Sequence, residues 1–70
     1  MTRQEIEAIA KRIATRIRAK RARLTGKDLY SYNNLTGDTI VWLNRTRAAL
    51  DRNNIEEATY FIQEAHKCWC

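Results

Sequence analysis

The side chains best suited to chemistry in this chain are arginines and lysines near its N-terminus. Residues 1–27 hold nine basic and two acidic residues, a net charge of +7, whereas residues 28–70 have a net charge of −2. Arginine outnumbers lysine in the basic segment, and its planar guanidinium pairs well with phosphate and carboxylate groups. The residues expected to bind a nucleic acid or an acidic protein partner are Lys11, Arg12, Arg16, Arg18, Lys20, Arg21, Arg23 and Lys27.

A helix would sort these cations into groups. Lys11 and Arg18 would share the outward face, and Arg12, Arg16 and Arg23 would lie along one flank. The small residues between them would let the helix approach a phosphate backbone closely. The alternative is a solvated face that keeps the helix soluble and binds nothing.

Three aromatic residues are candidate contacts beside the cations. Tyr30 and Tyr32 follow the basic segment, and Trp42 lies further along the chain. Exposed rings stack on unpaired bases, but tyrosines over a small core more often pack their rings and leave the hydroxyl in water. We therefore expect packing for both tyrosines, with Trp42 and Tyr32 as contacts if the partner is a protein.

The C-terminus offers weak metal ligands and no catalytic group. His66, Cys68 and Cys70 are good zinc ligand types, but no second ligand pair occurs elsewhere in the chain. Ser31 is the only serine and His66 the only histidine, and they lie far apart in sequence. We expect no metal site, no cofactor and no enzymatic activity.

Apolar periodicity predicts three helices. Residues 2–24 repeat apolar side chains at helical spacing, and Gly26 is placed to end that helix. Residues 25–37 contain both glycines and predict a connector with at most one short helical turn. Further helices are expected at about 38–51 and 54–68, joined by a tight turn. The fold class is therefore all-α: one domain over 1–70, a small three-helix bundle with a long basic N-terminal helix and a C-terminal antiparallel helix hairpin.

Each expected helix has an apolar stripe. The stripe of the second helix is Ile40, Leu43, Ala49 and Leu50. The stripe of the third is Ile55, Ala58, Ile62, Ala65 and Trp69. The stripe of the first is Ile6, Ala10, Ile13, Ile17 and Leu24, whose spacing suits a helix-helix seam and so favours a homodimer.

These features predict a non-enzymatic binding protein. The favoured interpretation is a small nucleic-acid-binding accessory or regulatory protein that contacts phosphates through its basic N-terminal helix. Acids at the start of the third helix disfavour sequence-specific duplex readout by a helix-turn-helix. The alternative is a small adaptor or inhibitor, of a size a bacteriophage encodes, that binds an acidic surface of a protein partner. Without an apolar segment of membrane-spanning length, we expect a soluble, cytoplasmic protein that binds no membrane.

Overall fold

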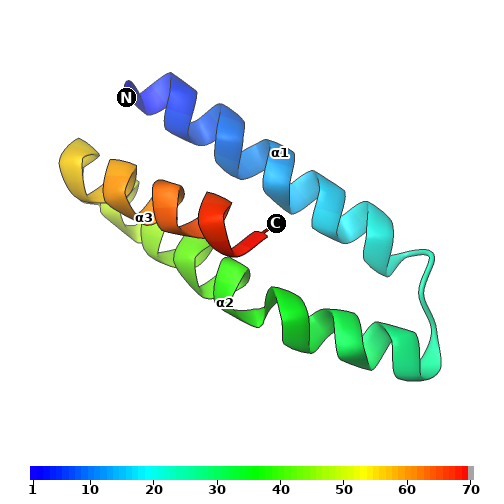
Figure 1. The fold of residues 1–70 in the computed structure, drawn as a ribbon. Helices are drawn as coiled ribbons and strands as arrows, with labels where there is room; N and C mark the ends of the chain where they lie inside the picture. The colour runs from blue at the N-terminus through cyan, green and yellow to red at the C-terminus, as the bar shows by residue number, and fades with distance from the viewer. Residues whose placement is uncertain (70) are drawn as a thin grey trace.

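The computed structural model describes residues 1–69 as three packed α-helices (Figure 1). α1 spans Arg3–Arg21, α2 spans Gly26–Asp51 and α3 spans Ile55–Trp69. α2 and α3 form the most extensive contact as an antiparallel hairpin, and α1 packs against both. The all-α bundle with a C-terminal hairpin is therefore confirmed. Within residues 1–69, no helix combines the length and hydrophobicity that crossing a membrane requires.

The predicted connector at 25–37 is wrong, because all of it after Thr25 belongs to α2. α2 is consequently the longest helix, and at about 1.5 Å per residue its 26 residues account for the 39 Å long axis of the molecule. No proline interrupts this segment, and the cost of Gly37 inside a helix, about 1 kcal/mol, is small enough for tertiary packing to offset.

Threonines complete the buried stripe of α2. Thr36, Thr39 and Thr46 are buried, and they join apolar positions at alternating spacings of three and four residues. The row with this spacing is Leu29, Tyr32, Thr36, Thr39, Leu43, Thr46 and Leu50, and Ala49 is fully buried beside it. The hydroxyls of Thr36 and Thr46 donate to the carbonyls four residues earlier, at 2.9 and 2.8 Å, so their burial leaves no unsatisfied donor. This continuous stripe is the reason that α2 starts twelve residues before the predicted second helix.

Local hydrogen bonds define the helix ends. Thr2 and Glu5 form a capping box that starts α1, and α1 ends at Arg21, three residues earlier than predicted. Gly26 adopts a left-handed conformation, with φ of 59°, but it opens α2 rather than closing α1. Asn53 is also left-handed, and the Asn54 side chain accepts a hydrogen bond from the Glu57 amide at 3.2 Å to start α3.

The core lies where all three helices meet. Its fully packed residues are Ile6, Ala49, Leu50, Ala58, Ile62 and Ala65. The stripe of α3 is thus confirmed, with Ile55 and Trp69 half-buried at its two ends. Ile6, Ile13 and Ile17 of α1 are also buried within the single chain. Three of the five residues of the stripe on which the homodimer prediction depended are therefore buried within one chain, while Ala10 and Leu24 are half-buried. The homodimer stays a prediction.

The two glycines are expected to respond to alanine with opposite signs. Gly37 is an interior helical residue with no atom within 4 Å of an added Cβ, so Gly37→Ala should stabilise the fold by about 1 kcal/mol. Gly26 has equal space but a positive φ, so Gly26→Ala should destabilise it by about 1 kcal/mol. Urea unfolding followed by circular dichroism measures both changes. A destabilised Gly37→Ala variant would contradict a continuous α2.

The buried hydroxyl of Thr39 should lower the stability of the fold. Its side chain is fully buried, and its hydroxyl has no hydrogen-bond partner in the described chain. Thr39→Val keeps the shape and removes the unsatisfied group, so it should raise the free energy of unfolding by about 1 kcal/mol. Thr46→Val is the matched control, because the Thr46 hydroxyl is already bonded to the Trp42 carbonyl. Equal changes in both variants, measured by urea unfolding, would contradict this explanation.

Candidate nucleic-acid interface

α1 presents a dense set of exposed cations. The exposed basic residues along its length and just beyond its end are Lys11, Arg12, Arg16, Arg18, Lys20 and Arg23. Within residues 1–69, none of these six forms an ion pair. Lys27 is likewise exposed, at the start of α2. Unpaired exposed cations keep their full charge available to an anionic ligand.

The two acids of α1 are both engaged near its N-terminus. The Thr2 backbone amide donates to the Glu5 carboxylate at 3.1 Å, and this bond, helped by the Thr2 hydroxyl, lowers the pKa of Glu5. Glu5 is therefore charged at neutral pH and held in the helix cap. Glu7 forms an ion pair with Arg3 at 3.1 Å. The part of α1 after Glu7 contains no acid to neutralise its cations.

One flank of α1 borders α2 across a groove of about 560 Å³. Lys11 and Arg18 line the α1 side of this groove, and Asn44 and Arg47 line the α2 side. The lining also includes small alanines of α1, together with the acids Glu7 and Asp51. Sequence reasoning missed Arg47 as a member of this group, because it becomes a neighbour of Lys11 and Arg18 only through the packing of the two helices.

The opposite flank of α1 combines cations with aromatic rings. Arg12, Arg16 and Lys20 follow one another at spacings of four residues, which places them in one row of α1. Arg23 follows in the turn after α1, where its backbone amide donates to the Lys20 carbonyl at 3.1 Å. The Arg16 guanidinium lies 5.5 Å from the ring centroid of Trp69, and the Lys20 ammonium lies 5.6 Å from that of Tyr32. Both distances fit cation–π interactions. We call these six residues the aromatic flank: Arg12, Arg16, Lys20, Arg23, Tyr32 and Trp69.

The end of α3 produces this arrangement. α3 is shorter than α2 and stops beside the middle of α1, so its last residues approach α1 (Figure 1). Trp69 is half-buried there, at the end of the core stripe of α3. Sequence analysis assigned Trp69 to the core and missed its contact with Arg16, since nothing in the local sequence links the two residues.

Only one of the three predicted aromatic contacts lies beside the basic helix. Tyr32 is half-buried under Lys20, whereas Tyr30 is 71% exposed on α2, which contradicts the packing expected for it. Trp42 packs against Phe61 and lies under Arg45, whose guanidinium is 5.0 Å from its ring centroid. Trp42 thus belongs to a cluster on the α2–α3 hairpin.

Arg21 differs from the other predicted binding residues. It is half-buried, and its Nε atom is shielded from solvent without a hydrogen-bond partner in the described chain. The rest of its side chain reaches solvent only in part, so Arg21 contributes less exposed charge than its neighbours. We therefore do not count Arg21 among the exposed cations that would contact a ligand.

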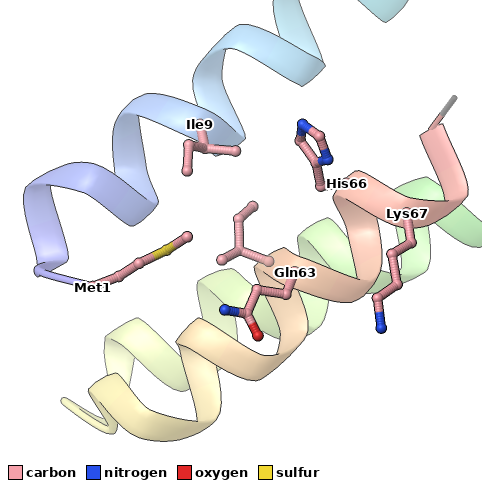
Figure 2. A pocket seen from close by; sticks show the side chains of 6 residues that line it. Met1, Ile9, Gln63, His66 and Lys67 are labelled. Carbon is pink, nitrogen blue, oxygen red and sulfur yellow. The ribbon is translucent and has the colours of Figure 1, made fainter.

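An open apolar cleft of about 390 Å³ lies between α1 and α3 (Figure 2). Met1 and Ile9 lie on one side, and Gln63, His66 and Lys67 lie on the α3 side.

The three candidate metal ligands His66, Cys68 and Cys70 do not form a site within the described residues. No group of three potential ligands occurs among those residues, and Cys70 lies outside them. Cys68 is an exposed free thiol.

In comparisons with known proteins, no family model, no curated protein and no solved structure matches this chain. Its function is therefore inferred from its own residues.

Proposed function

We propose that the protein is a small nucleic-acid-binding accessory or regulatory protein whose basic α1 contacts phosphates without catalysing a reaction. The observation that supports this most strongly is the set of six exposed cations on and just after α1 without ion pairs in the described structure. Such cations can replace the counterions that surround a nucleic acid, and the released ions favour binding. A cytoplasmic location would bring the protein together with such ligands.

The length of the cationic surface fits an extended polyanion. Lys11 to Arg23 spans about 18 Å at 1.5 Å per residue, and cations one helical turn apart meet successive charges of a linear ligand. Ala19 and Ala22 lie between the long basic side chains and allow close approach. The acids at the start of α3, Glu56 and Glu57, would repel phosphates from the other end of the molecule.

A fluorescence-anisotropy titration with short duplex DNA, single-stranded DNA and RNA tests the proposal. If the four cations of one flank each neutralise one phosphate, the slope of log K against log salt should be about −3 to −4. Affinity for a single strand should then fall about 50-fold between about 50 and about 200 mM salt. No binding to any of the three ligands at the lower salt concentration would reject the proposal.

The second candidate function is a small adaptor or inhibitor of an acidic protein partner. The apolar cleft between α1 and α3 supports it, since a cleft beside cations can accept an apolar side chain of a protein that also presents acids. The cluster of Trp42, Tyr60 and Phe61 supports it as well, with Tyr60 55% exposed. Capture of one protein from a lysate, unaffected by added DNA, would favour this candidate over the first.

A further inference from the structure

We infer that the aromatic flank of α1 binds single-stranded nucleic acid, with phosphates on its cations and bases against the rings of Trp69 and Tyr32. This inference rests on the proposed function and adds that the nucleic acid is single-stranded. The cations alone would accept a duplex or a single strand. The rings are the feature that distinguishes the two ligands.

The two rings lie beside the cationic row at neighbouring positions. Arg16 contacts Trp69 and Lys20 contacts Tyr32, and Arg16 and Lys20 are one helical turn apart. Trp69 comes from α3 and Tyr32 from α2, so all three helices contribute to the flank. Two rings next to successive cations match a strand in which bases alternate with phosphates.

The shortness of α3 leaves this region partly uncovered. α2 starts far from the α2–α3 turn, and its first turns extend past the end of α3 (Figure 1). Trp69 and Tyr32 both remain half-buried rather than buried. Leu35, in the same part of α2, is 77% exposed. An unpaired base can therefore approach the rings from the side that α3 does not cover.

Half-burial of Trp69 and Tyr32 against the bundle restricts the movement of these rings before a ligand arrives. The cations lie beside the rings at 5.5 and 5.6 Å, and a guanidinium plane can itself stack on a base. A preorganised ring loses less conformational freedom when a base binds. The opposite groove between α1 and α2 has Lys11, Arg18 and Arg47 but no aromatic residue in its lining. Of the two flanks of α1, the aromatic flank is therefore the one that offers a reason to prefer unpaired bases.

Trp69 provides a direct reporter, because the chain contains only two tryptophans. In a Trp42→Phe variant, all tryptophan fluorescence comes from Trp69. We would titrate this variant with oligo(dT) and, separately, with a DNA duplex of the same length. The single strand should quench Trp69 and bind about tenfold more tightly than the duplex, because two stacked bases contribute about 100-fold and the denser charge of the duplex offsets about sixfold of it at about 0.1 M salt. The duplex should bind with little quenching.

Substitution of the ring supplies a second measurement on the full-length chain. Trp69→Leu should reduce single-strand affinity about tenfold and leave duplex affinity within about twofold. Tyr30→Leu is the matched control, because Tyr30 is exposed on α2 and has no ring or cation contact in the described structure. It should leave both affinities unchanged. Circular dichroism establishes that each variant is folded, and if Trp69→Leu does not fold, the quenching experiment decides.

Two results would overturn the inference in distinguishable ways. If single strand and duplex bind equally without quenching of Trp69, the stacking role is wrong while phosphate binding by α1 stands. If neither ligand binds at low salt, the proposed function fails and the inference fails with it.

Discussion

Replacing Arg12, Arg16 and Lys20 together with glutamine is expected to weaken single-strand binding about 100-fold at about 0.1 M salt. Each phosphate contact to a single strand contributes about 0.7 to the salt exponent, which is about fivefold in affinity at that concentration. Three lost contacts multiply to about 100-fold, and the salt slope should fall from about −3 to about −1. All three residues are exposed, so the fold should persist. Anisotropy titrations at several salt concentrations measure both quantities.

A matched triple variant distinguishes the effect of where the cations lie on α1 from the effect of the total charge of the protein. Changing Lys11, Arg18 and Arg47 to glutamine removes the same charge from the groove on the other flank of α1. Those residues do not contact the aromatic flank, so single-strand affinity should fall only a few-fold, by loss of long-range attraction. Equal losses in the two triple variants would show that net charge, rather than the aromatic flank, determines binding.

Helices whose buried stripe is apolar were predicted correctly from the sequence, and the helix whose buried stripe contains threonines was predicted only in part. α3 was predicted closely because isoleucine, alanine and tryptophan mark its core stripe. The first half of α2 was missed because its stripe includes Thr36 and Thr39, and the predicted stripe of the second helix contained apolar residues alone. The two adjacent asparagines and Gly37 strengthened that error. Counting threonine as a buried residue would have revealed alternating spacings of three and four from Leu29 to Leu50.

The candidate site was predictable only where it depends on a single helix. The placement of Arg12 and Arg16 on one flank follows from helical periodicity and was predicted, whereas Lys20 was not assigned to that flank. The contacts of this row depend instead on where α3 ends and how α1 crosses it, and these are tertiary properties. Trp69 and Arg16 are 53 positions apart in the chain. No local pattern specifies that they meet.

Ile62→Ala should remove most of the stability of the fold and leave a large unfolded fraction at 25 °C. Ile62 is fully buried in α3 within the cluster that includes Ile6 and Ala49. Truncating a buried isoleucine to alanine costs about 2–5 kcal/mol, and a chain of this size has a total stability of about 3–5 kcal/mol. Leu35→Ala is the matched control, because that leucine is 77% exposed, and its effect should be within about 0.5 kcal/mol. Circular dichroism and urea unfolding measure both.

The same variant tests whether binding requires the folded arrangement. Ile62→Ala preserves every charge of the chain, but without packed α3 it cannot hold Trp69 against Arg16. Its affinity for a single strand should therefore fall to its affinity for a duplex or below it, because both are then set by charge and the duplex is the more densely charged ligand. A retained preference for single strands in the unfolded variant would show that base contacts arise without the bundle. A lost preference would assign the discrimination to the geometry that α3 imposes on α1.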